Sequence, residues 1–137
     1  MNRGAITTDL ARGFLPFEWV RFAYLFGSVA RGEEGPGSDV DVGISVARPP
    51  SADDLLALAD SLCRACLRDD VQIVLLDRLG PGILHRVLQE GILLLDRDRD
   101  RRIAWTAERL SEWYDFAPTY HLWREAFWDA CRRKASG

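Results

Sequence analysis

The sequence predicts an α/β (α+β) protein in which helices cover a mixed sheet of about four strands. Short apolar and β-branched runs alternate with segments of helical periodicity, and glycine or proline separates them. The chain has 137 residues, 47% of them hydrophobic and 28% charged, which is the size and composition of one globular domain. We therefore expect a single domain over residues 1–137.

The first two strands are expected on either side of a loop. Residues 19–26 form an aromatic and β-branched run that ends at Gly27 and Ser28, as a buried strand entering a turn does. A glycine- and proline-rich stretch over 32–37 predicts the loop. Residues 39–46 then alternate between apolar and polar or small side chains, which is typical of a second strand.

A helix is expected after residue 50. Ser51 and Asp54 resemble a capping box in which Asp takes the place of the usual Glu or Gln. The residues that follow carry one apolar stripe suited to packing on a sheet, formed by Leu55, Ala59, Leu62 and Cys66. Residues 71–76 predict the third strand.

The chain after residue 80 predicts three helices and one strand. A helix is expected from Pro81 to Gly91, because proline favours the first helical position and glycine the C-terminal cap. Residues 92–95 predict a fourth strand, and two C-terminal helices follow, separated by Pro118. The charged run over 96–102 alternates in sign and is interpreted as a solvated linker and helix start.

Composition excludes several classes of function. Eighteen Lys and Arg residues against 21 Asp and Glu give a net charge of −3, so no general binding to nucleic acid or to an anionic membrane is expected. The sequence has no apolar run of about 18 residues and no signal peptide, which predicts a cytoplasmic protein. Cys63 and Cys66 have redox or zinc spacing but no second pair, so we interpret them as part of a buried helix face.

Two carboxylates near the start of the second strand are the main candidates for chemistry. Side chains alternate along a strand, so Asp39 and Asp41 point to the same side. Like charges this close need a compensating cation, and two carboxylates combined with substrate phosphates suit Mg²⁺. Gly43, the next residue on this face, would leave space for a ligand.

The turn after the first strand is the candidate phosphate site. Backbone N–H groups of a tight turn at Gly27 and Ser28 can bind phosphate oxygens, and the Ser28 hydroxyl adds a donor. Arg31 is placed to reach a phosphate or a leaving pyrophosphate, or else it is a structural arginine on the surface.

These two motifs have the spacing of a known family. Gly27-Ser28, ten further residues and then Asp39-Val40-Asp41 resemble the signature of the minimal nucleotidyltransferase family. The resemblance implies a polymerase-β-like nucleotidyltransferase fold. It also implies that the two aspartates bind Mg²⁺ and that the glycine-serine turn holds the triphosphate of ATP.

The resemblance covers about residues 20–96 and leaves a C-terminal helical part over 97–137. Residues 85–94 are similar to the last helix and strand of the family. In size the chain resembles the MntA-type antitoxins, which act with HEPN ribonuclease toxins and can transfer AMP from ATP to a toxin tyrosine. The resemblance therefore implies a HEPN-type toxin as partner.

The family supplies a third carboxylate from the next strand, and two registers are open here. Asp70 in one register would serve as general base or last metal ligand. Gln72 takes the position in the ungapped register, which would weaken catalysis.

Two functions therefore remain open. The chain either adenylylates a hydroxyl of its partner or is a noncatalytic antitoxin that blocks a HEPN ribonuclease by occlusion, and the third carboxylate distinguishes them. Transfer to a small molecule such as an aminoglycoside ranks last, because it normally needs an added substrate-binding domain. The C-terminal aromatic residues predict either core packing or a partner-binding surface, and they are Trp105, Trp113, Phe116, Tyr120, Trp123, Phe127 and Trp128.

Overall fold

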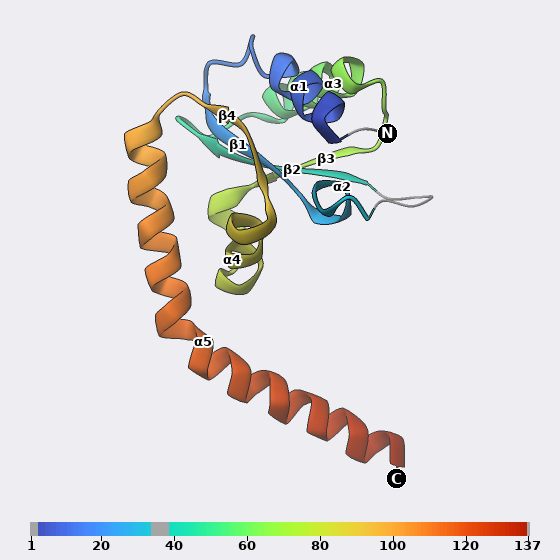
Figure 1. The fold of residues 1–137 in the computed structure, drawn as a ribbon, viewed down its shortest axis with the longest axis vertical. Coiled ribbons are helices and arrows are strands. Elements are labelled where there is room, and N and C mark those ends of the chain that lie inside the picture. The colour runs from blue at the N-terminus through green and yellow to red at the C-terminus, as the bar shows by residue number, and fades with distance from the viewer. Residues whose placement is uncertain (1–2, 34–38, 137) are drawn as a thin grey trace.

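The computed structural model describes residues 3–33 and 39–136, so part of the loop expected over 32–37 lies outside the described residues. Four strands form one mixed sheet, β1 (Val20–Phe26), β2 (Val40–Val46), β3 (Val71–Leu75) and β4 (Ile92–Asp96). Their order across the sheet is β3-β2-β1-β4 (Figure 1). β1 runs antiparallel to β2 and β4, and β2 runs parallel to β3. The predicted fold class is confirmed.

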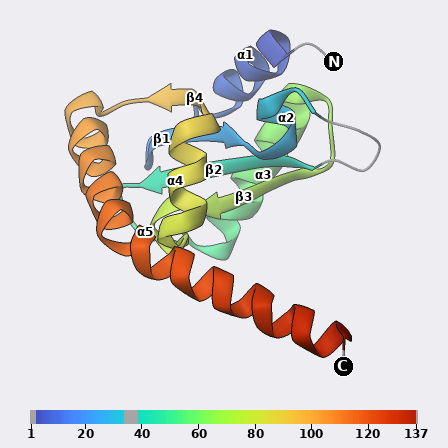
Figure 2. The same cartoon turned by 60° about the horizontal axis from the view of Figure 1, so that its bottom comes forward.

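Helices cover both faces of this sheet (Figures 1 and 2). On one face, α1 (Arg3–Gly13) and α3 (Ala52–Cys66) pack together. They share a buried apolar cluster with β1 and β2, which includes Ile6, Leu10, Phe14, Ala23, Leu25, Val42, Ile44, Leu58 and Leu62. α1 was not expected, although the spacing of Ile6, Leu10 and Phe14 at intervals of four is a helical signal.

The opposite face carries α4 (Pro81–Glu90) and a second apolar cluster, formed by Phe22, Tyr24, Leu76, Leu84 and Val87. Leu76 begins a short 3₁₀ turn, η1 (Leu76–Arg78), which ends β3 one residue earlier than expected. Alternation along β1 sends Phe22 and Tyr24 to this face and Ala23 and Leu25 to the other.

The predicted start of α3 is confirmed. The Ser51 hydroxyl accepts a hydrogen bond from the Asp54 N–H at 3.0 Å, and Asp54 Oδ2 accepts one from the Ser51 N–H at 2.9 Å. Cys66 is buried at the end of this helix and Cys63 is half-buried, with both thiols free. This agrees with the interpretation of the two cysteines as part of a helix face.

α4 has the proline start and the glycine cap that were expected, but the cap has another physical basis. Gly91 has a φ of −71°, which is an ordinary conformation rather than a left-handed one. A Cβ at Gly91 would lie 2.4 Å from the Val87 carbonyl oxygen, so the position requires glycine because of this close approach.

The expectation of two C-terminal helices is wrong. A single helix, α5 (Arg99–Ser136), contains Pro118 in its interior. Proline removes one helical hydrogen bond and bends a helix without necessarily ending it. Figure 1 shows α5 changing direction about midway and then extending away from the sheet.

The first half of α5 packs on the body of the protein. Trp105 lies against Phe22 with ring centroids 5.1 Å apart, and its Nε1–H donates to Asp77 Oδ1 at 3.0 Å. Trp113 stacks on His85 at 4.5 Å. These contacts support core packing for the proximal aromatic residues.

The charged run over 96–102 is more than a solvated linker. The Arg97 guanidinium donates to four backbone carbonyl oxygens of the segment between α1 and β1 at 2.5–3.2 Å, those of Phe14, Leu15, Phe17 and Val20. Arg97 therefore ties this segment to the end of β4. None of the helices within 3–33 and 39–136 combines the length and apolar character that a membrane crossing requires.

Candidate active site

The two candidate metal ligands lie at the beginning of β2. Asp41 is paired across the sheet with Phe26 of β1 on one side and Gln72 of β3 on the other. Asp39 precedes the strand by one residue and is exposed. Since side chains alternate along the chain here, both carboxylates belong to the sheet face that carries α4.

The turn after β1 closes directly over Asp41. Gly27 has a φ of +79° and begins a short helix, α2 (Gly27–Arg31). A Cβ on Gly27 would lie 2.5 Å from Asp41 Oδ2, so only glycine allows this contact. The structure thus brings together the glycine-serine turn and the aspartate pair, which are ten or more residues apart in the sequence.

The electrostatics of the pair fit a bound cation. Burial, and to a lesser extent the charge of Asp39, raise the pKa of Asp41 above its ordinary value. An ionised Asp41 is therefore unfavourable in the absence of a positive charge. Two carboxylate ligands on one side, one half-buried and one exposed, are the donor set that Mg²⁺ takes when phosphate and water oxygens complete its coordination.

The structure places Gln72, not Asp70, beside the pair. Gln72 Nε2 donates to Asp39 Oδ2 at 2.9 Å. Asp70 is held instead by Arg68, whose Nε and Nη2 lie 2.8 and 2.5 Å from its two carboxylate oxygens. Arg68 also lowers the pKa of Asp70. Among the described residues, no group of three His, Cys, Asp or Glu side chains is arranged to hold a metal ion.

Arg31 lies on α2 and has two acidic partners. Its Nε is 3.0 Å from Glu33 Oε2, and its Nη1 is 3.3 Å from Glu90 Oε2 at the end of α4. These two carboxylates raise the pKa of Arg31 and neutralise part of its field. The ion pair with Glu90 also fastens α2 to α4, which is the structural role that the sequence left open.

The space expected beside Gly43 is filled. A Cβ at Gly43 would lie 2.5 Å from Leu76 Cδ2 and 3.5 Å from Phe26 Cε1, so two apolar side chains occupy this part of the face. The sequence did not indicate this, because Leu76 was expected to continue the third strand. Glycine here permits tight packing under the site and leaves no ligand space.

Arg86 is a candidate that sequence reasoning missed. It lines a pocket of about 170 Å³ together with Gly27 and Arg31. Arg86 lies on α4 three residues after Ile83 and four before Glu90, and residues at these intervals share one helix face. This spacing was the signal in the sequence that could have grouped Arg86 with these two residues.

Comparisons with known proteins show the family and the fold of this chain. A family model described as "Polymerase beta, Nucleotidyltransferase" matches residues 14–100. No match was found among curated proteins.

Solved structures share the fold over nearly the whole chain. A chain from a toxin-antitoxin complex with AMP-PNP is 22% identical, with a TM-score of 0.65, and the match covers 96% of this chain and 99% of that one. A chain from a complex of the tri-AMPylated Shewanella oneidensis HEPN toxin with its MNT antitoxin is 17% identical, with a TM-score of 0.67 and the same coverage. A MntA-HepT structure is 18% identical, with a TM-score of 0.64, and covers 93% of this chain and 97% of that one. The chain belongs to the polymerase-β nucleotidyltransferase family, and its structure matches that of MntA antitoxins from HEPN/MNT toxin-antitoxin pairs.

Proposed function

We propose that this protein is a Mg²⁺-dependent nucleotidyltransferase that transfers AMP from ATP to a tyrosine hydroxyl of a HEPN-type toxin. The observation that carries the proposal is the contact of Gly27 with Asp41, which joins a phosphate-binding turn to a carboxylate pair suited to a cation. Membership of the family supports the class of reaction. The AMP-PNP and the AMPylated toxin in related complexes support the nucleotide and the acceptor.

Each residue of the site has a role in this reaction. Asp39 and Asp41 would hold Mg²⁺, which neutralises charge on the phosphates. Gly27 and Ser28 would orient the triphosphate through backbone N–H groups and the Ser28 hydroxyl. The acceptor oxygen then forms a bond to the α-phosphorus as the bond to pyrophosphate breaks, and pyrophosphate leaves.

The acceptor hydroxyl must also lose a proton. Asp70 is the proposed base, and it can act only if its carboxylate leaves Arg68 and turns toward the pair. Residues 1–137 would work as one unit. The proposed location is the cytoplasm, where ATP is available for the reaction.

The distal half of α5 supports a protein partner. Leu122, Phe127 and Trp128 are exposed by 70%, 47% and 50% on a helix that extends away from the sheet (Figure 2). Apolar and aromatic side chains of this kind are enriched at protein interfaces. The side chains of Tyr120 and Trp123 lie outside the described residues.

A test of the proposal uses ATP labelled at the α- or the γ-phosphate. The purified chain is incubated with Mg²⁺, labelled ATP and the product of the neighbouring gene, which is the proposed HEPN-type partner. Label from the α-phosphate should enter the partner, and label from the γ-phosphate should not. The Asp39→Ala/Asp41→Ala variant is the control, and equal α-label incorporation with this variant would show that the pair is not the catalytic site.

One observation favours a second candidate, a noncatalytic antitoxin that acts by occlusion. Gln72 takes the place beside Asp39, and Asp70 is held by Arg68. We expect Gln72→Asp to distinguish the two functions, because it adds a third carboxylate next to the pair. A general base contributes about 10²–10⁴-fold to rate. Transfer by Gln72→Asp at least tenfold above a wild type that transfers no AMP would identify the native chain as a noncatalytic antitoxin, and equal transfer by both would show that Asp70 or solvent already suffices.

A further inference from the structure

The small pocket beside the Gly27 turn contains two arginines in different electrostatic situations. Arg31 is engaged by Glu33 and Glu90. Arg86 is exposed and has no hydrogen bond or ion pair with any residue of 3–33 and 39–136. Arg86 is therefore the cation of this pocket that is available to a ligand.

The size of the pocket indicates how much of a ligand it can take. Sites that enclose a whole small molecule usually measure about 300–1,000 Å³. The pocket measures about 170 Å³, so it suits one end of a nucleotide. Gly27 both lines the pocket and contacts Asp41. The pocket would therefore take the part of the nucleotide next to the α-phosphate, which the proposed reaction places at Asp41.

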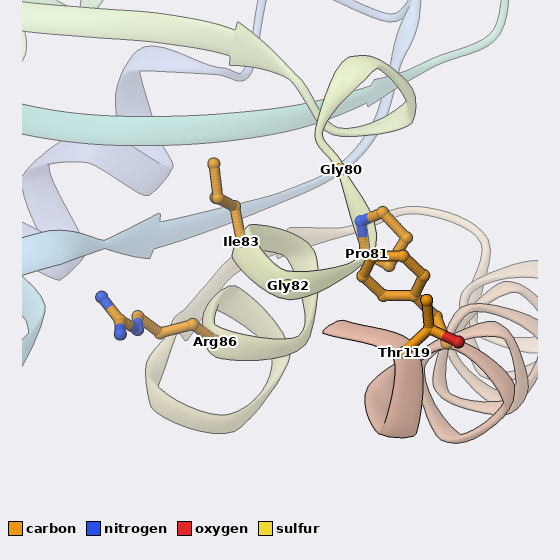
Figure 3. Close-up of a pocket in the computed structure, with 7 residues that line it drawn as sticks. Gly80, Pro81, Gly82, Ile83, Arg86 and Thr119 are labelled. Carbon is orange, nitrogen blue, oxygen red and sulfur yellow. The ribbon is translucent and has the colours of Figure 1, made fainter. Parts of the chain in front are cut away.

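The Arg86 side chain lies on one side of α4. Figure 3 shows Ile83 and Arg86 extending to the side of α4 away from Pro81 and Thr119. Pro81 and Thr119 line a larger pocket of about 700 Å³ at the start of α4, which also includes Ile83 and Arg86. A guanidinium can donate two parallel hydrogen bonds to phosphate oxygens. Glu90 also lines the small pocket, but its carboxylate is paired with Arg31.

We propose that Arg86 binds the terminal phosphates of the nucleoside triphosphate and then holds the pyrophosphate as it leaves. Arg31, neutralised in part by its two carboxylates, contributes less. The proposal rests on the proposed function, because it requires that the site bind a nucleotide with Mg²⁺.

Calorimetric titration of the full chain with AMP-PNP and Mg²⁺, and separately with AMP, tests the proposal. Arg86→Ala should weaken AMP-PNP binding by about tenfold or more, since a hydrogen bond to a charged group is worth about 1.5–3 kcal/mol. Binding of AMP should not change, because AMP lacks the terminal phosphates. Arg86→Lys should recover part of the affinity, and Arg31→Ala should have a smaller effect than Arg86→Ala.

Arg78→Ala is the matched control, because Arg78 is an exposed arginine of η1 that lines neither pocket. Unchanged AMP-PNP affinity in Arg86→Ala, with tight binding to the wild type, would overturn the role of Arg86 and leave the proposed function standing. Equal weakening of AMP and AMP-PNP would also overturn it. If Arg86→Ala weakens only the binding of the partner protein and not that of AMP-PNP, the role of Arg86 is instead to contact an acidic segment of the partner. No binding of AMP-PNP to the wild type would end both proposals.

Discussion

At Gly27 the carboxylate of Asp41 lies so close to the backbone that no residue with a Cβ fits. The positive φ of 79° and the 2.5 Å that would separate a Cβ at this position from Asp41 Oδ2 act together. We expect Gly27→Ala to lower the free energy of unfolding by about 1–3 kcal/mol and to abolish nucleotide transfer, because Asp41 must move.

Chemical denaturation and the transfer assay measure the two effects of Gly27→Ala. Gly80→Ala is the matched control, since Gly80 has a φ of −68° and a Cβ added there would have no atom within 4 Å among the described residues. A Gly27→Ala variant with full stability and full transfer would contradict the close contact over Asp41.

Asp41 links stability to metal binding. Its raised pKa means that ionised Asp41 opposes folding at neutral pH, because burial and Asp39 disfavour the charge. We expect Asp41→Asn to raise the melting temperature of the metal-free protein at pH 7 by roughly 1–3 °C and to remove the stabilisation that Mg²⁺ gives the wild type. Thermal melts with Mg²⁺ and with EDTA measure both effects, and a variant that Mg²⁺ still stabilises would place the ion elsewhere.

The sequence predicted that Gly27 lies near Asp39 and Asp41 better than it predicted the surroundings of these residues. The alternation of Asp39 and Asp41 and the turn at Gly27 are local patterns, and the structure joins them. The position of Gln72 depends on the register between β2 and β3. A sequence does not reveal the register of parallel strands that lie far apart along the chain. Arg86 and Leu76 reach the site by packing of α4 and η1 on the sheet, and no local pattern encodes such packing.

Among the helices, α3 has the best defined beginning. Asp54 accepts hydrogen bonds from the Ser51 N–H and from Arg48 Nη1 at 2.9 and 2.7 Å, and these partners lower its pKa to about 2 from an ordinary 3.8. A lowered pKa stabilises the fold above pH 3.8, and this contribution is lost as the pH falls toward 2.

We expect the stability of the wild type to fall between about pH 4 and pH 2 more steeply than that of Asp54→Asn, which has no charge to lose. Denaturation midpoints at about pH 6, 4 and 2.5 measure the difference. Asp53→Asn is the control in the same first turn, because Asp53 has no ion pair within the part of the chain that the structure describes. Parallel pH profiles for wild type and Asp54→Asn would show that the capping box carries no charge-dependent stability.

Helix ends with capping residues were predictable, and helix length was not. Ser51, Pro81 and Gly91 are local signals, and the helices begin or end at them. Pro118 predicts a boundary by its local chemistry, but α5 continues through it as a bend. Arg97 lies in a run that resembles a linker, yet it is fixed by four carbonyls some 80 residues earlier in the chain.

On the scale of the whole molecule, the distal half of α5 extends away from the sheet, which carries Asp41 (Figure 2). Leu122 on the distal half is 70% exposed, and Leu56 on α3 is 68% exposed. We expect Leu122→Glu to weaken binding of the HEPN-type partner by about tenfold or more, as loss of an important interface residue does, while nucleotide affinity stays unchanged. Leu56→Glu introduces the same charge at an equally exposed leucine and should bind normally; equal affinities for the two variants would place the interface elsewhere.

The proposed reaction of the whole molecule is the transfer of AMP to a partner hydroxyl at the Asp39 and Asp41 pair. The intact mass of the HEPN-type partner, after incubation with the chain, ATP and Mg²⁺, is its most direct test. We expect a mass increase of one or more AMP groups with the wild type and none with Asp39→Ala/Asp41→Ala. A partner that forms a stable complex with the wild type and gains no mass would contradict the proposed transfer and identify the protein as a binding module.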